Sequence, residues 1–241
     1  MKFSYEFRVS SQDVDLNGIA SATAVMRYIQ ESANLQHEHY GPTLDEIRKS
    51  GTAFILSRVA LDIYKPIYAQ DILRVTTWLN DAHGYGYTRS TAVQRNDERV
   101  AAMTAFWGAI NIEERRPIRV EEIKLGFGTD EDKLDMASPV RFRANGADFN
   151  ELGDYKVVYG DCDENVHLNN TNYPRIFCGF VPDMLGKRVT NLSINYLYEA
   201  RLGASFKVFS AENDGVTVFK TILENGSVGS EARMVLADIN E

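Results

Sequence analysis

The sequence predicts an α+β protein built from two similar halves, each with a helix packed on a strongly curved antiparallel sheet. First, a short polar segment occurs twice, at 13–21 and 161–169, with Asp, Asp and Asn in the same alternate positions. Second, each copy precedes apolar residues at the three-and-four spacing of a helix. Third, each helical pattern precedes several period-two segments, which are typical of half-buried antiparallel strands. This repeated order indicates a duplicated unit.

The composition is typical of a soluble globular protein, with 44% apolar and 25% charged residues among 241. Two cysteines, Cys162 and Cys178, leave no metal-binding spacing and favour a reducing, cytoplasmic location. We therefore expect no cofactor and no metal. No apolar run is long enough to span a bilayer, and charges interrupt the N-terminal segment, so we expect neither a membrane span nor a signal peptide. A net charge of -8 without any Lys-Arg block disfavours nucleic-acid binding.

The first helix is expected from residue 22 to at least residue 33, with Ser21 as its N-cap. A shorter helix at 42–48 has no equivalent in the second half, and we expect this insertion to explain why the offset between the halves falls from 148 at the polar segments to 133 at the strands. The second main helix is expected to run over three turns from Tyr173 to Leu185, with Asn170 or Thr171 as its cap.

The remaining periodic segments are predicted strands. They cover 59–63, 72–79, 86–95 and 99–111 in the first half and 192–198, 204–211, 215–224 and 228–238 in the second. Between the halves, a segment rich in Gly, Asp and Pro has no sustained period and is interpreted as a surface linker. The predicted organisation is a structural, pocket-forming half at 1–125, a linker at 126–152 and a catalytic half at 153–241.

The second polar segment contains the pattern Asp163-x-Asn165-x-His167-x-Asn169-Asn170. In an extended chain these alternate side chains would face broadly one direction. The helix that follows would offer unpaired N–H groups and the positive end of its dipole. Glu199, at the end of an apolar strand, would have its pKa raised by partial burial unless a histidine partner opposed the shift. Together these groups would supply a base and oxyanion donors.

Each of these residues also has a plainer interpretation. Asp163 and Asn165 are common turn and cap formers, and Glu199 could be a surface charge beside Arg201. The duplication supplies a comparison, because the first half has Ile19 where the second has His167, and Pro66 where the second has Glu199. Neither replacement can transfer a proton. The hypothesis is therefore one working site in the second half, with the first half structural.

The pattern resembles that of the acyl-acyl carrier protein thioesterases of plant plastids and bacteria, and the duplicated order resembles their tandem (double) hotdog fold. The resemblance rests on the polar octad together with the following segments: 75–78 (Val-Thr-Thr-Trp), 115–117 (Arg-Arg-Pro) and 196–199 (Tyr-Leu-Tyr-Glu), with Arg201 and Gly203. It implies that Asp163, Asn165, His167 and Glu199 are catalytic. One departure is Ala200, because the plant enzymes have a cysteine directly after the glutamate.

A thioester is already activated, so water, a base and oxyanion donors suffice for its hydrolysis. The expected substrate is an acyl chain carried on acyl carrier protein, which is released as a free fatty acid in fatty acid biosynthesis. Expected substrate-binding residues are Asn169, Asn170, Tyr173, Arg115 and Arg116, the two arginines facing the acidic carrier. Two alternatives remain open: an acyl-coenzyme A thioesterase, and a catalytically silent acyl-binding module. A homodimer is compatible with all of these.

Overall fold

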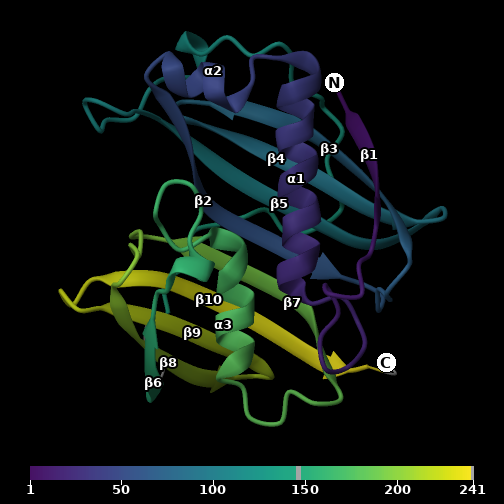
Figure 1. Ribbon diagram of the computed structural model, residues 1–241, viewed down its shortest axis with the longest axis vertical. Helices are drawn as coiled ribbons and strands as arrows, with labels where there is room; N and C mark the ends of the chain where they lie inside the picture. Colours follow the sequence, from purple (N-terminus) through teal and green to yellow (C-terminus); the bar gives the residue numbers. More distant parts are fainter. Residues whose placement is uncertain (145–147, 240–241) are drawn as a thin grey trace.

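The structure is a computed structural model that describes residues 1–144 and 148–239, and these form one ten-stranded antiparallel sheet. The strand order is β1-β3-β4-β5-β2-β7-β10-β9-β8-β6. Helices α1 and α3 lie on the same face of this sheet, α1 over the first half and α3 over the second (Figure 1). The predicted α+β class is confirmed.

The first half contains β1 (Phe3–Arg8), α1 (Ala22–Tyr40), α2 (Leu44–Lys49), β2 (Thr52–Ile63), β3 (Ile72–His83), β4 (Gly86–Arg95) and β5 (Glu98–Asn111). The second half contains β6 (Asn150–Lys156), α3 (Tyr173–Gly179), β7 (Lys187–Tyr196), β8 (Ser205–Asn213), β9 (Val216–Leu223) and β10 (Val228–Asp238). Short 3-10 turns occur at Val120–Glu122, Tyr159–Asp161 and Asn170–Asn172. Apart from α2, each element of the first half has a counterpart in the second.

The two halves join through β2 and β7, which pair antiparallel at the centre of the sheet. Ala60 lies opposite Ser193 in this pairing, and these two residues are 133 positions apart, the same offset that relates the strands of the halves. A residue opposite its own equivalent marks a pseudo-twofold axis, as in an isologous dimer interface. The chain therefore has the symmetry of a dimer fused into one polypeptide.

The core lies between the helices and the inner face of the sheet. Leu61 of β2 and Leu192 of β7 are completely buried, and Phe177 of α3 stacks on Phe219 of β9 with ring centroids 4.8 Å apart. Burial of side chains of this size contributes about 1.5–3 kcal/mol each. The alternation of apolar residues along the strands thus determines which face of the sheet is apolar, and the helices pack on that face.

The second main helix is shorter than predicted. The prediction of three turns to Leu185 is wrong: α3 ends at Gly179, and Leu185 is 74% exposed. Val181 and Met184 still pack against the core, but they do so from the turns after the helix. The periodic spacing therefore predicted correctly which residues are buried, but it predicted a longer helix than the structure has. α1 is 19 residues long and α3 is 7, so the change in offset between the halves reflects this difference as well as the inserted α2.

Two edge strands, β1 and β6, precede the two main helices; a strand before each helix belongs to the order that the sequence predicts, but without a residue range. Both consist largely of exposed or half-exposed residues, because an edge strand on a curved sheet can be held by its ladder with little apolar alternation. β6 begins at Asn150, so its first three residues lie within the segment 126–152 predicted as linker.

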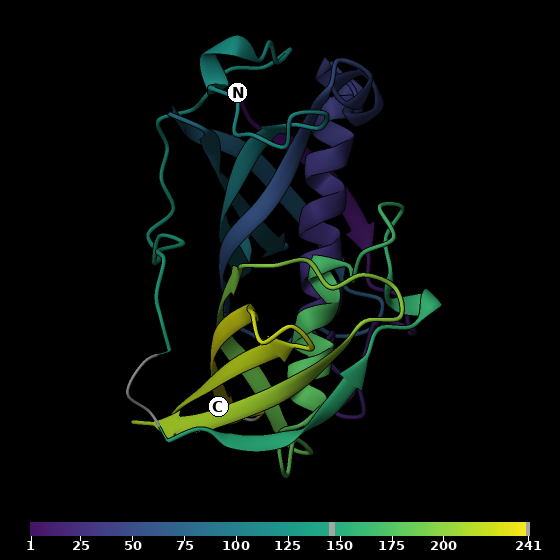
Figure 2. The same ribbon diagram turned by 90° about the vertical axis from the view of Figure 1, so that its left-hand side faces the viewer.

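Before β6, the segment 129–144 runs along the face of the sheet opposite the helices (Figure 2). Its backbone carbonyl groups accept hydrogen bonds from outward-facing side chains of the sheet: Asp132 from Trp78 at 2.7 Å, Pro139 from Arg58 at 2.9 Å and Phe142 from Asn195 at 2.7 Å. These bonds satisfy polar groups that the segment covers. No helix in the described part of the chain is long and apolar enough to cross a membrane.

Candidate active site

The two polar segments fold into the same backbone turn. Asp15 N–H donates to the Ile19 carbonyl at 2.8 Å, and Asp163 N–H donates to the His167 carbonyl at 2.9 Å. Isolated β-bridges join Ile19 to Tyr68 and His167 to Arg201. The repeat seen in the sequence is therefore a repeat in structure, which makes the first half a true internal reference for the second.

His167 and Glu199 meet at the second turn. His167 Nδ1 lies 3.4 Å from Glu199 Oε2, and the side chains are 21% and 56% exposed. His167 is held by the turn, whereas Glu199 lies in the connection three residues beyond the end of β7. Glu199 is therefore less buried than the sequence predicts. The pair has the arrangement of a base with its orienting carboxylate.

Asp163 organises the turn. Its Oδ1 accepts hydrogen bonds from the N–H groups of Asn165 at 2.9 Å and His167 at 3.4 Å. The segment is therefore a tight turn, so the condition of an extended chain, under which its four side chains would face one direction, is not met. Val166 has φ of 63°, a left-handed conformation that is costly for a β-branched residue. Gly18 occupies the equivalent position at φ 74°. The strain lies in the half that keeps the titratable groups.

Arg48 is a site residue that sequence reasoning missed. It lies on α2 of the first half, and its Nη2 donates to Asn165 Oδ1 at 3.0 Å and Glu164 Oε1 at 2.7 Å in the second half. One hint of this contact was present in the sequence, namely the predicted short helix at 42–48 that has no counterpart in the second half. An element that is present in only one half can contact only one of the two polar turns. The first half thus supplies a side chain to the second polar turn.

The first turn after the motif offers fewer free N–H groups than expected. Thr171 N–H donates to Asn169 Oδ1, Asn172 N–H to the Asn169 carbonyl, and Arg175 N–H to Thr23 Oγ1 at 3.1 Å. Within the described residues, the Asn170 N–H donates to no protein acceptor. It is therefore the candidate oxyanion donor on this turn.

The predicted substrate-binding residues near the turn divide into different roles. Asn169 caps the 3-10 turn, with its Oδ1 accepting from both Thr171 N and Thr171 Oγ1. The Asn170 carbonyl accepts from the Tyr196 hydroxyl at 3.0 Å. Tyr173 is 3% exposed and packs on Tyr196; burial and the nearby Glu199 charge both raise its pKa. Tyr173 therefore lies beside the His167–Glu199 pair as part of its apolar wall.

The comparisons with known proteins decide the family. A family model described as the N-terminal domain of acyl-ACP thioesterases matches residues 1–124. The chain belongs to the acyl-ACP thioesterase family. It is 26% identical over 192 residues to oleoyl-acyl carrier protein thioesterase 2 of Arabidopsis thaliana, a match that covers 71% of this chain and 52% of that protein. A palmitoyl-acyl carrier protein thioesterase of Gossypium hirsutum is 25% identical over 187 residues, 71% of this chain and 45% of its own. The chain spans about half the length of these curated relatives.

Solved structures share the whole fold. The acyl-ACP thioesterase of Bacteroides thetaiotaomicron matches with a TM-score of 0.89 at 18% identity, over 98% of both chains. The 12:0-ACP thioesterase of Umbellularia californica matches with a TM-score of 0.77 at 19% identity, over 98% of this chain and 97% of its own. The predicted tandem hotdog fold is confirmed.

Ala200 follows Glu199 in this member of the acyl-ACP thioesterase family, and it is 2% exposed. Cys162 and Cys178, the two cysteines of the chain, are not suited to act as a nucleophile in place of a cysteine at position 200. Burial and the charges of Asp161 and Asp163 raise the pKa of Cys162, and burial raises the pKa of Cys178 to about 12. A thiolate nucleophile needs a lowered pKa. Among the described residues, no three His, Cys, Asp or Glu side chains are grouped so that they could hold a metal ion.

Arg115 and Arg116 lie on the exposed turn that follows β5. Arg116 pairs with Glu114, which neutralises its charge, whereas Arg115 has no carboxylate within 4.0 Å among the described residues. The Ile112 N–H donates to the Gly51 carbonyl at 2.9 Å, so this turn adjoins the end of α2, the helix that carries Arg48. The arginine turn is therefore a neighbour of α2, the element that reaches the second polar turn.

Asn17, the first-half equivalent of Asn165, has a structural role. Its Nδ2 donates to the Lys187 carbonyl at 2.9 Å and the Met184 carbonyl at 3.3 Å, and its Oδ1 accepts from Gly186 N–H at 2.7 Å. These hydrogen bonds connect the first turn to the second half, and they engage both the NH2 group and the oxygen of the Asn17 side chain.

We expect Asn17→Ala to lower the free energy of unfolding by about 1–3 kcal/mol, because backbone groups of the second half lose their partners. Urea denaturation measures this change. Asn165→Ala is the matched control, since the exposed Asn165 side chain bonds only Arg48 within the described chain. Equal stability of the two variants would contradict the structural role of Asn17.

Proposed function

We propose that the protein is a thioesterase that hydrolyses acyl-acyl carrier protein to a free fatty acid and the carrier. The proposal rests on the contact of His167, on the second polar turn, with Glu199, beyond the end of β7, at 3.4 Å; the first half has Ile19 and Pro66 at the equivalent positions. Family membership supports the thioester as substrate. The silent-module alternative is less favoured, because a turn that only held a helix end would not need this pair.

In the proposed reaction His167 acts as the general base, and Glu199 orients and stabilises the imidazolium that forms. The oxygen of a water molecule attacks the thioester carbonyl carbon while its proton passes to the imidazole. The Asn170 N–H stabilises the oxyanion. Collapse of the tetrahedral intermediate breaks the carbon–sulfur bond, and the departing thiolate takes the proton from His167. Asp163 holds the turn through its two N–H bonds and so positions His167.

The decisive experiment incubates the purified protein with an equimolar mixture of acyl carrier protein and coenzyme A thioesters of several chain lengths. We expect free fatty acids to be released, and faster from the carrier than from coenzyme A. Mass spectrometry of the acids and of both thiol products separates the two sources. Release only from coenzyme A would favour the acyl-coenzyme A thioesterase instead. No release from either would favour the silent acyl-binding module.

Carrier docking is proposed at the arginine turn beside α2. Acyl carrier protein is acidic and this chain has a net charge of -8, so an encounter needs a local basic surface. We expect Arg115→Glu to raise KM for a carrier-bound substrate more strongly at low salt, while coenzyme A substrates change little. KM measured at two ionic strengths checks this. An equal effect on both substrates would remove Arg115 as the docking contact.

Arg48 is proposed to position Asn165 at the catalytic turn. We expect Arg48→Ala to lower kcat about tenfold, because a charge-assisted hydrogen bond to the turn is lost. The adjacent Lys49→Ala removes the same charge without contacting the turn, and its kcat should equal that of wild type. If Lys49→Ala lowers kcat as much as Arg48→Ala, the effect comes from the charge of α2 and not from the contact.

A further inference from the structure

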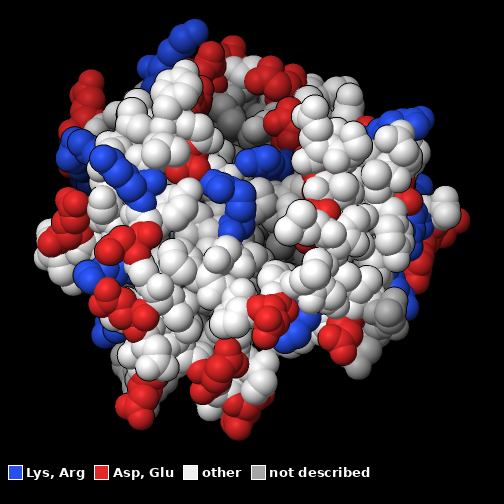
Figure 3. All heavy atoms as spheres, turned by 60° about the horizontal axis from the view of Figure 1, so that its bottom comes forward, with Lys and Arg blue, Asp and Glu red and all other residues white. Residues whose placement is uncertain are grey.

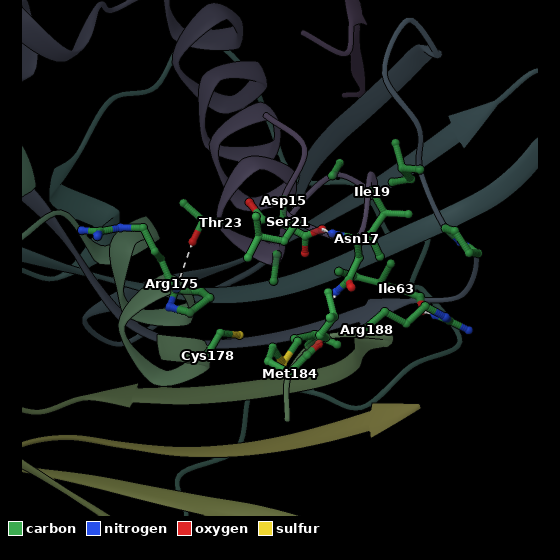
Figure 4. Close-up of a pocket in the computed structure, with 18 of the residues that line it drawn as sticks. Asp15, Asn17, Ile19, Ser21, Thr23, Ile63, Arg175, Cys178, Met184 and Arg188 are labelled. Carbon is green, nitrogen blue, oxygen red and sulfur yellow. Dashed lines mark hydrogen bonds between the residues drawn. The ribbon is translucent and has the colours of Figure 1, made fainter. Parts of the chain in front are cut away.

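A cavity occupies the first-half counterpart of the active site. It has a volume of about 280 Å³ and lies between the first polar turn, the start of α1, the end of β2 and α3 with the segment that follows it. Figure 4 shows Asn17 and Ile19 on one side of it and Cys178 and Met184 on the other. Figure 3 shows this end of the molecule, which is hollowed near its centre and carries both acidic and basic side chains.

This first-half counterpart has a cavity but lacks the histidine and the glutamate of the second half. Ile19 and Pro66, which replace the histidine and the glutamate, both line the cavity. Most of the other lining side chains are apolar, including Ile63, Met184 and Val189. The volume of about 280 Å³ lies just below the range of about 300–1,000 Å³ that is typical of small-molecule sites. The pseudo-twofold axis thus gives a second site of the same origin, with an apolar wall and no catalytic pair.

Arg188 of β7 lines the same cavity and is 6% exposed. Its Nη1 donates to the Ile63 carbonyl at 3.0 Å, and its Nε has no hydrogen-bond partner. Within the described residues no carboxylate lies within 4.0 Å of it. A buried guanidinium without a counter-charge is costly, and it provides several donors in a geometry that matches a carboxylate.

The other charged lining residues are already engaged. Arg175 Nη2 lies 2.6 Å from Asp161 Oδ1, so its charge is neutralised within the chain. Asp15, the acidic residue among the described lining side chains, keeps its negative charge but is held within its own turn, where it accepts the Asn17 N–H at 2.8 Å. Arg188 is therefore the cation of this cavity that is left for an external anion.

We propose that this cavity binds an aliphatic carboxylate, that is, a free fatty acid of medium chain length, with its head group on Arg188 and its chain along the apolar wall. A free fatty acid is also the product class of the proposed function, but binding here requires no turnover. The inference therefore goes beyond that function and stands or falls separately from it.

The test is a titration of the full chain, labelled at isoleucine and methionine methyl groups, with octanoate and followed by NMR. We expect the methyl signals of Ile19, Ile63 and Met184 to shift in a saturable way. Octanol, which has the same chain without the charge, should need at least about tenfold higher concentration for the same shifts. Arg188→Gln should weaken octanoate binding by a similar factor and leave octanol binding unchanged.

Lys187→Gln is the matched control, because it removes one positive charge at the adjacent residue, which does not line the cavity. Its octanoate affinity should equal that of wild type. Equal affinity of the wild-type protein for octanoate and octanol would overturn the proposal without any variant. Octanoate-induced shifts that spare Ile19, Ile63 and Met184 would overturn it as well. Neither result bears on thioester hydrolysis, which the thioester mixture tests independently.

Discussion

His167→Ala is expected to lower kcat for an acyl-carrier substrate at least about 100-fold, because it removes the group that takes the proton from water. Glu199→Gln keeps the size of the side chain and removes the charge 3.4 Å from His167 Nδ1, so we expect a loss of similar size. Steady-state kinetics on the folded variants, with thermal unfolding recorded for each, measures both effects.

The control for this prediction is Cys162→Ala. Cys162 is also in the second polar segment, but the pKa of its thiol is raised, so its loss should leave kcat close to wild type. Loss of hydrolysis in Cys162→Ala, with the protein still folded, would show that a thiol nucleophile operates and that the water mechanism is wrong. Unchanged kcat in His167→Ala would equally contradict the proposed base.

Asp161→Asn is expected to destabilise the protein by about 2–4 kcal/mol, the largest stability effect predicted for the motif. Asp161 is 4% exposed and accepts hydrogen bonds from Tyr155 Oη at 2.9 Å and Val158 N–H at 3.0 Å, besides its ion pair with Arg175. The asparagine side chain accepts hydrogen bonds only at its oxygen, because its NH2 group donates, so it cannot accept bonds at both terminal atoms as the carboxylate does. The half-exposed Arg175 also loses its counter-charge. Urea denaturation gives the change in free energy of unfolding.

Asp163→Asn, two residues further along, makes the same chemical change at a partly exposed position. Its Oδ1 accepts only backbone N–H groups of its own turn in the described chain, and an asparagine oxygen can keep them. We therefore expect a loss of stability under about 1 kcal/mol, with kcat reduced through the altered charge beside His167. A larger loss of stability for Asp163→Asn than for Asp161→Asn would reverse the assignment of the two aspartates.

The sequence determined the features that depend on local pattern. Alternation and three-and-four spacing predicted eight of the ten strands of the described chain and all of its α-helices, because burial on one face imposes these periods. The offset of 148 predicted the paired turns, whose equivalent β-bridges now confirm it. The offset of 148 at the turns and the offset of 133 at the strands also singled out His167 and Glu199, because the first half has Ile19 and Pro66 in their places. The edge strands β1 and β6 were expected before each helix but could not be given residue ranges, because their ladders require little apolar alternation.

Only the tertiary structure decided what depends on contacts between the halves. Arg48 and Asn165 are 117 positions apart, and no pattern in the sequence relates them. The length of α3 was set by packing, since turns can present Val181 and Met184 to the core as well as a helix can. Arg188 lies outside every helix and strand that the sequence predicts, and only the pairing of β2 with β7 buries it beside the Ile63 carbonyl. Side-chain periodicity reports which face of an element is buried, whereas the partners on that face follow from how the chain closes around its pseudo-twofold axis.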